Sequence, residues 1–79
     1  YIPDNQYRNP QVCDGIQKMI DKGVKVVLFP PNIPWKDIND MVMPTKGNMA
    51  IRDLLKLIAQ NVYQGMAASL QFAELRKVR

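Results

Sequence analysis

The chain has 79 residues, of which 47% are hydrophobic and 23% charged, and its formal net charge is +4. This length allows one small domain, and the ordinary composition argues against a disordered or low-complexity segment. The sequence has no histidine and one cysteine, which excludes histidine-based zinc sites, Ser-His-Asp triads and a disulfide within the chain. A metal site would need oxygen ligands, which favours Mg²⁺. No apolar run approaches the roughly 20 residues that span a bilayer, so we expect no membrane partner.

The first predicted elements are the end of a strand and a helix. Tyr1–Pro3 reads as a strand end, and because the chain starts there with Tyr rather than Met, we expect it to be a piece of a longer polypeptide. A helix is predicted over Asn9–Lys22, with Asn9 as the N-cap and Pro10 at the first helical position. Gly23, just past its end, is a typical helix stop.

The next segment, Val24–Phe29, is β-branched and almost continuously apolar, which predicts a strand covered on both faces. Strand, helix and strand in this order predict a βαβ unit, whose two strands are parallel in nearly every case. The carboxyl ends of parallel strands lie at the same edge of a sheet. We therefore expect Asp4 and the region of Asp37 to emerge on one side of the sheet, where open α/β sheets place their chemistry.

Two interpretations of these acidic residues stay open. Asp37 can be the N-cap of a short helix, with Asp40 at its third helical position in a capping-box arrangement, and a capping acid can also bind a metal. Asp4 can simply close an Asx-type turn after its strand. If the carboxylates meet, they repel one another unless Arg8, Lys36 or Mg²⁺ lies between them.

An amphipathic helix follows, for which Asn48 can serve as cap. We expect it to pack on the sheet through the apolar stripe Ile51, Leu54, Leu55, Ile58 and Val62. After it, apolar residues alternate with small or polar ones from Met66 to Phe72. This period of two predicts a C-terminal strand, although Met, Ala, Leu and Glu favour helices.

The chain ends in a basic cluster with few acidic neighbours: Arg76, Lys77 and Arg79. Such an end suits the phosphates of a nucleic acid or an acidic protein surface. The plainer interpretation is a solvated tail that aids solubility.

This order of elements resembles the C-terminal part of the DNA primases of T-even-type tailed phages, across essentially the whole chain. The most specific parts are Trp35–Met41 and Asn61–Ala68, with the spacing between them. The resemblance implies an α/β, partial Toprim-like fold: a parallel βαβ unit, then an amphipathic helix and a C-terminal strand. Residues 1–65 would be the C-terminal half of the Toprim-like catalytic domain, and residues 66–79 a strand with a basic tail.

The resemblance also implies an activity, which is synthesis of short RNA primers in the cytoplasm of the infected host cell. DNA template, nucleotides and the replicative helicase would be the partners, and Mg²⁺ the cofactor. The implied metal ligands are Asp4, Asp37, Asn39 and Asp40. The implied phosphate or nucleic-acid contacts are Arg8, Lys36, Arg76, Lys77 and Arg79.

The sequence departs from the family pattern at two points and lacks one residue. Gln6 and Asn39 stand where an acidic residue is usual, and the family's catalytic glutamate would precede Tyr1. We therefore assign no catalytic residue to this chain, and we expect it to bind metal weakly and to be inactive alone. The alternative is a non-catalytic interaction module that binds the replicative helicase or single-stranded DNA.

Overall fold

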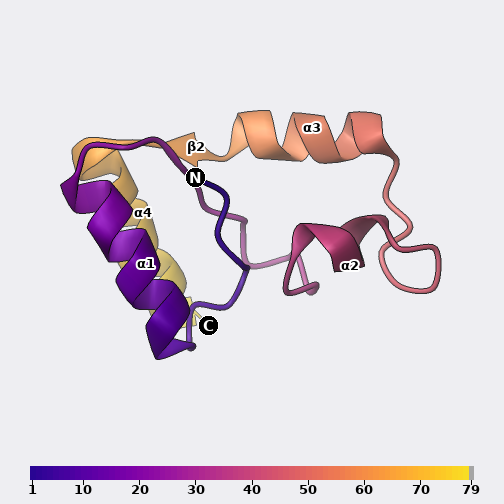
Figure 1. Ribbon diagram of the computed structural model, residues 1–79, viewed down its shortest axis with the longest axis horizontal. Helices are drawn as coiled ribbons and strands as arrows, with labels where there is room; N and C mark the ends of the chain where they lie inside the picture. Colours follow the sequence, from indigo (N-terminus) through magenta and orange to yellow (C-terminus); the bar gives the residue numbers. More distant parts are fainter. Residues whose placement is uncertain (79) are drawn as a thin grey trace.

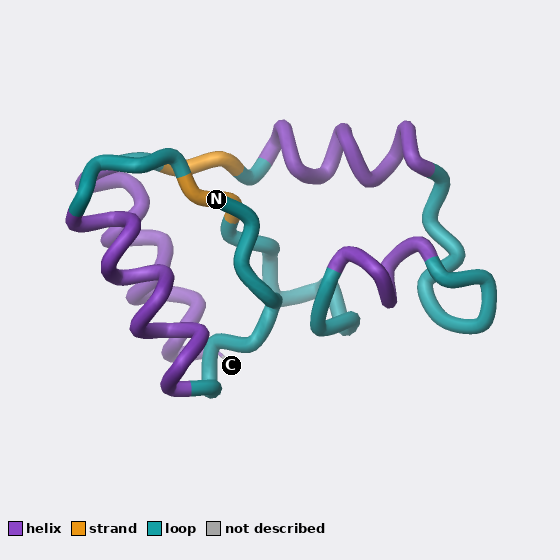
Figure 2. The backbone as a smooth tube through the Cα atoms, viewed as in Figure 1, coloured by secondary structure: helices purple, strands orange, loops and turns teal. Residues whose placement is uncertain are grey.

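The structure, a computed structural model, describes residues 1–78, and this part of the chain forms four helices and two short strands. The helices are α1 (Pro10–Asp21), α2 (Ile38–Val42), α3 (Ile51–Gln60) and α4 (Gly65–Val78). The strands are β1 (Val26–Val27) and β2 (Val62–Tyr63). Figures 1 and 2 show α1 and α4 on one side of the strands and α2 and α3 on the other. The fold is thus a small mixed α/β arrangement.

The β1 segment separates two apolar clusters. Val26 and Leu28 face the cluster formed with α1 and α4, whereas Val27 and Phe29 face the cluster formed with α2 and α3. All four side chains are buried. Successive side chains of an extended segment point to opposite faces. The prediction of a strand covered on both faces is confirmed, although the regular strand is shorter than Val24–Phe29.

The sheet is antiparallel, and its second strand was not predicted. Val26 pairs with Tyr63 and Val27 with Val62. The pairing continues past β1, because the Leu28 N–H donates to the Asn61 carbonyl over 2.9 Å. Val62 was predicted to belong to the apolar stripe of the preceding helix, because two residues are too few to display a strand period.

The N-terminal residue also lies beside β1, but its hydrogen bonds follow the parallel pattern. The Tyr1 ammonium group donates to the Lys25 carbonyl over 3.0 Å, and the Val27 N–H donates to the Tyr1 carbonyl over 2.9 Å. This is the hydrogen-bond pattern of a single parallel bridge between Tyr1 and Val26. Residues 1–3 do not form a regular strand, so the structure does not show the parallel βαβ unit, which stays a proposal.

The predicted boundaries of α1 are confirmed. The Asn9 side chain accepts hydrogen bonds from the N–H groups of Gln11 and Val12, and Pro10 is the first helical residue. Gly23, after the helix, has a φ of 77°, a left-handed conformation that suits glycine. Local capping signals therefore fixed this helix correctly.

The prediction of a C-terminal strand is wrong, because the segment from residue 65 forms the helix α4. Its buried residues are Ala68, Phe72 and Leu75, which follow helical spacing, whereas Met66 and Leu70 are 80% and 64% exposed. The buried residues pack into the same cluster as α1. Tertiary packing on α1 and the helix-forming residue types override the apparent period of two. The division of the chain after residue 65 stays a prediction.

The helix α3 is confirmed, but its predicted cap and stripe need correction. Ala50 occupies the N-cap position without a side-chain hydrogen bond, and Asn48 instead has a φ of 49° in the preceding turn. Leu54 is buried against β1 and α2, whereas Ile51 and Leu55 are 63% and 60% exposed. Val62, which lies in β2 rather than on the helix, is also exposed, so three of the five predicted stripe residues face solvent.

Candidate functional site

One buried asparagine joins the loop before α1 to the loop before α2. The Asn5 N–H donates to the Lys36 carbonyl over 2.6 Å. Its side-chain amide nitrogen donates to the carbonyls of Ile33 and Trp35 over 2.8 and 3.0 Å. Both donors of the amide are thereby used, and Asn5 is only 3% exposed. Sequence reasoning missed this residue, because no local pattern reveals three bonds to residues about 30 positions away.

Asp4 and Asp37 adjoin this junction. Asp4 precedes Asn5 in the chain, and Asp37 follows Lys36, so the Asn5–Lys36 hydrogen bond brings the two segments together. Asp4 is exposed and lines a shallow pocket of about 350 Å³ with residues 1–3, Gln11 and Val12. Asp37 is half-buried. That the two carboxylates share one Mg²⁺ stays a prediction.

The two acids of the α2 region are engaged in structural contacts. Asp37 is the N-cap of α2, since its Oδ1 accepts the Asp40 N–H over 2.8 Å, as predicted. The Asp40 carboxylate forms an ion pair with Lys46 at 3.2 Å. Asp40 is 9% exposed, so this pairing offsets the cost of burying its charge. Asn39 is exposed on α2, and its carbonyl accepts the Met43 N–H.

Within residues 1–78, no three His, Cys, Asp or Glu side chains gather into a group that could hold a metal ion. The Asp40 carboxylate is already paired with the Lys46 ammonium group. Asp37 uses one oxygen in its cap, which leaves its second oxygen for a ligand. Mg²⁺ often keeps several waters and binds through only one or two carboxylates together with substrate phosphates. Metal binding by the predicted ligands Asp4, Asp37, Asn39 and Asp40 stays a prediction.

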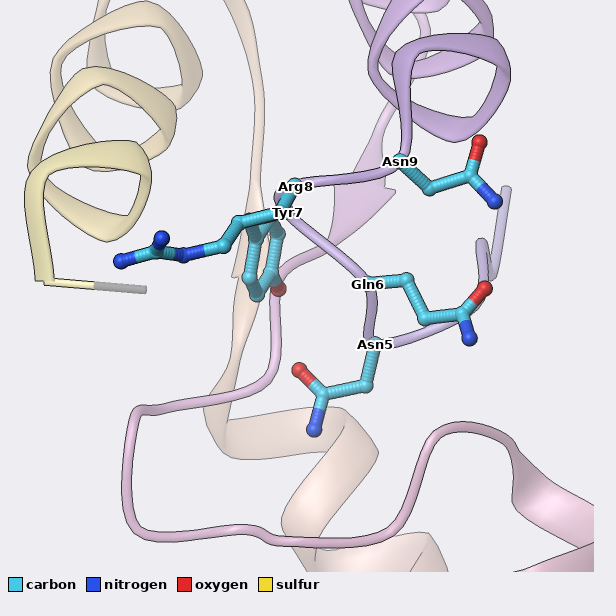
Figure 3. A pocket seen from close by; sticks show the side chains of 5 residues that line it. All are labelled: Asn5, Gln6, Tyr7, Arg8 and Asn9. Carbon is cyan, nitrogen blue, oxygen red and sulfur yellow. The ribbon is translucent and has the colours of Figure 1, made fainter.

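The loop that leads into α1 forms a second pocket, shown in Figure 3, of about 400 Å³. It is lined by Asn5, Gln6, Tyr7, Arg8 and Asn9. The Asn5 side-chain oxygen is buried and has no hydrogen-bond partner among the described residues. In Figure 3 this oxygen lies on the Tyr7 side of the amide, and the Arg8 side chain extends toward the last turn of α4.

The last turn of α4 carries two basic residues, and one of them lies over an aromatic ring. The Arg76 guanidinium lies over the Phe72 ring at 5.3 Å from its centroid, and the Phe72 ring contacts the Tyr7 ring with centroids 6.3 Å apart. The Tyr7 hydroxyl donates to the buried Phe29 carbonyl over 3.1 Å. A contact of a guanidinium with an aromatic face is worth about 0.5–1 kcal/mol at an exposed site. The aromatic pair therefore holds Arg76 near the start of α1.

The remaining predicted phosphate contacts differ in their surroundings. Lys36 is exposed, and its carbonyl takes part in the Asn5 junction. Lys77 lies 3.5 Å from Glu74, and both side chains are largely exposed, so this ion pair contributes little to stability. Arg79 lies outside the described residues. The nucleic-acid role of each stays a prediction.

Among the described residues, none of the helices combines the length and the apolar character that a bilayer crossing requires.

The fold and these loops define a small mixed α/β unit with acidic and basic side chains near one junction. No family model matches the chain. The chain is similar to a DNA primase of Enterobacteria phage T4, with 26% identity over 80 residues. The similarity covers 99% of this chain and 22% of that primase, so the chain spans about a fifth of the length of the relative it matches. It supports a relationship to part of a phage primase.

Proposed function

We propose that this chain is a segment of a DNA primase and contributes part of a Toprim-like catalytic domain. The observation that carries the proposal is the similarity to the T4 primase along nearly the whole chain. A primase role implies contact with DNA template and nucleotides in the cytoplasm of the infected host cell. The whole enzyme's activity belongs to the proposal, because the chain matches only 22% of that relative.

The parallel arrangement that a Toprim-like fold requires has one source of support in the structure. Tyr1 exchanges hydrogen bonds with Lys25 and Val27 in the parallel sense, and α1 lies between these two segments in the chain. In a longer polypeptide, residues before Tyr1 would extend this pairing alongside residues 24–25, which precede β1. The antiparallel strand β2 occupies the other edge of β1.

Asp4 and Asp37 are the residues that we propose for metal binding. They adjoin the Asn5–Lys36 hydrogen bond, and among the described residues neither forms an ion pair with a lysine or arginine, whereas Asp40 is paired with Lys46. A hydrated Mg²⁺ bound there would neutralise charge on nucleotide phosphates. Lys36, exposed between the junction and Asp37, would contact a phosphate. The chain's own contribution is to hold the two carboxylates through the Asn5 junction.

A chimera tests this proposal. The aligned stretch of the T4 primase is replaced by this chain, and primer synthesis is measured on a single-stranded template with Mg²⁺. We expect primers from the chimera, and a loss of at least about tenfold with Asp4→Asn or Asp37→Asn, because each removes one ligand charge. Asn caps helices about as well as Asp, so Asp37→Asn preserves α2. Asp53→Asn, an equal charge change at an exposed position of α3, is the control.

Two outcomes count against the proposal. A chimera that melts cooperatively but makes no primers would refute the primase role. Primer synthesis that responds to the Asp4 and Asp37 variants no more than to the Asp53 variant would refute the metal role. If the chimera does not fold, a Mn²⁺ titration of the 79-residue chain followed by NMR decides the metal role, since amide signals of both loops should broaden at lower Mn²⁺ concentrations than signals of the rest of the chain.

The second candidate is a non-catalytic module that binds the replicative helicase or single-stranded DNA. The observation that favours it is the cationic end of α4, where Arg76 is held over Phe72. The helicase stays a proposal that rests on the resemblance alone. Replacing Arg76 and Lys77 with Ala in the chimera separates the two partners, because loss of helicase-stimulated priming with basal priming intact indicates docking.

A further inference from the structure

The loop before α1 and the last turn of α4 form one cationic face, defined here by Arg8, Arg76 and Lys77. Arg8 and Lys77 are exposed, and Arg8 extends toward the end of α4 that carries the other two cations (Figure 3). These residues are nearly 70 positions apart in sequence, and the packing of α4 on α1 brings them to one end of the molecule. Glu74 is the acid paired with Lys77, which leaves the two guanidinium groups to dominate the face.

The guanidinium of Arg76 is held in place. It lies over Phe72, whose ring contacts Tyr7, and the Tyr7 hydroxyl is fixed on the Phe29 carbonyl. Both aromatic residues are buried, with Phe72 2% and Tyr7 4% exposed, so they support the cation rather than offer a stacking surface. A planar guanidinium that is already oriented loses little freedom when it binds a phosphate with two parallel hydrogen bonds.

A pocket lies beside this face, in the loop before α1. Its volume of about 400 Å³ is in the range of small-ligand sites. Asn5 is one of its lining residues, and the buried side-chain oxygen of Asn5 has no donor among the described residues, while the nitrogen of the same amide is fully bonded. A buried acceptor without a partner is unfavourable, so a local movement that exposed this oxygen would let an N–H group of a ligand or a water bond to it.

We propose that the cationic face and its pocket bind the backbone of single-stranded nucleic acid, with phosphates on Arg8 and Arg76 and one nucleotide at the pocket. The choice of nucleic acid over an acidic protein rests on the proposed function. The face and the two carboxylates have different proposed roles. The cationic face binds the single-stranded nucleic acid, whereas Asp4 and Asp37 bind the metal that acts on nucleotide phosphates. Lys77, partly neutralised by Glu74, contributes less than the two arginines.

Direct binding by the 79-residue chain tests this. Fluorescence anisotropy is measured with a labelled single-stranded DNA of about 12 nucleotides, a length near the site sizes of small single-strand binders. We expect Arg8→Ala with Arg76→Ala to weaken binding about tenfold at low salt and to reduce the slope of log K against log salt by roughly 1.4, because two phosphate contacts are lost. The pair Arg8→Lys with Arg76→Lys should lose less, since it keeps the charge but not the bidentate geometry.

The matched control is Lys18→Ala with Lys22→Ala. These exposed lysines lie at the other end of α1 from Arg8, and their removal lowers the net charge by the same two units. We expect less than about a twofold change from it, as only the general charge differs. Circular dichroism melting confirms that each variant is folded, and the Arg→Lys pair keeps the aliphatic contact with Phe72 if the alanine pair does not fold.

Three results would overturn the proposal. An equal loss of affinity in the Arg8→Ala, Arg76→Ala variant and in the Lys18→Ala, Lys22→Ala control would mean non-specific attraction to a basic chain. No loss in the arginine pair would remove the face from DNA binding. Binding of poly-glutamate without binding of the oligonucleotide would assign the face to an acidic protein. Because this assay does not involve primer synthesis, its failure is distinct from a failure of the primase proposal.

Discussion

Replacing Gly47 with Ala is expected to lower the free energy of unfolding by about 3 kcal/mol, the upper part of the range for overpacking. A Cβ at this position would collide with the Met41 carbonyl group, and backbone atoms at the end of α2 cannot move aside as a side chain can. The Gly47 N–H donates to the Asp40 carbonyl, and the Met49 N–H donates to the Met41 carbonyl, so both sides of the contact are fixed. Thermal melting by circular dichroism measures the effect.

Gly15→Ala is the control for this substitution. A Cβ there meets the Tyr1 hydroxyl at 2.8 Å, the far end of a side chain that is 48% exposed and free to swing away. Ala is also favoured over Gly inside a helix by roughly 0.5–1 kcal/mol. We expect the melting temperature to stay the same or rise. If both glycine variants melt alike, the close approach of residues 41 and 47 is wrong.

Replacing Leu75 with Ala should cost about 3 kcal/mol, whereas Leu70→Ala should stay within about 0.5 kcal/mol. Leu75 is 1% exposed in the cluster between α1 and α4, and Leu70 is 64% exposed on the outer face of the same helix. The two variants remove the same atoms, so their difference reports burial alone. For a domain of this size the Leu75 variant should melt more than roughly 10 °C lower.

The same pair distinguishes the helix from the strand that the sequence favoured. A strand with Met66, Ala68, Leu70 and Phe72 on its inner face would bury Leu70 beside Phe72. Leu70→Ala would then be as costly as Phe72→Ala, and Leu75 would matter less. A large loss at Leu70 would therefore contradict α4.

Elements with strong local signals were predicted from the sequence. The helix α1 has an Asn cap, a Pro at its first position and a Gly after its end, and each of these acts within a few residues. The continuous apolar run around β1 also indicated burial on both faces. The segments that failed, β2 and α4, depend on contacts with partners far away in the chain, about which local periodicity says nothing.

The candidate site shows the same division. The capping role of Asp37 was predictable, because it needs only the spacing to Asp40. The pairing of Asp40 with Lys46 was missed, although the two residues are only six positions apart, because it depends on the path of the turn between them. Asn5 and the support of Arg76 by Phe72 were missed for a different reason, since packing across the fold creates both.

The position of β1 between the two apolar clusters has a consequence for how the chain unfolds. Val26 and Leu28 belong to one cluster and Val27 and Phe29 to the other, so disordering of this segment would remove buried side chains from both clusters at once. The segment is also hydrogen-bonded on both edges, to Tyr1 and to residues 61–63. We therefore expect the two halves to melt together, so that the chain unfolds as one cooperative unit despite the small size of its sheet.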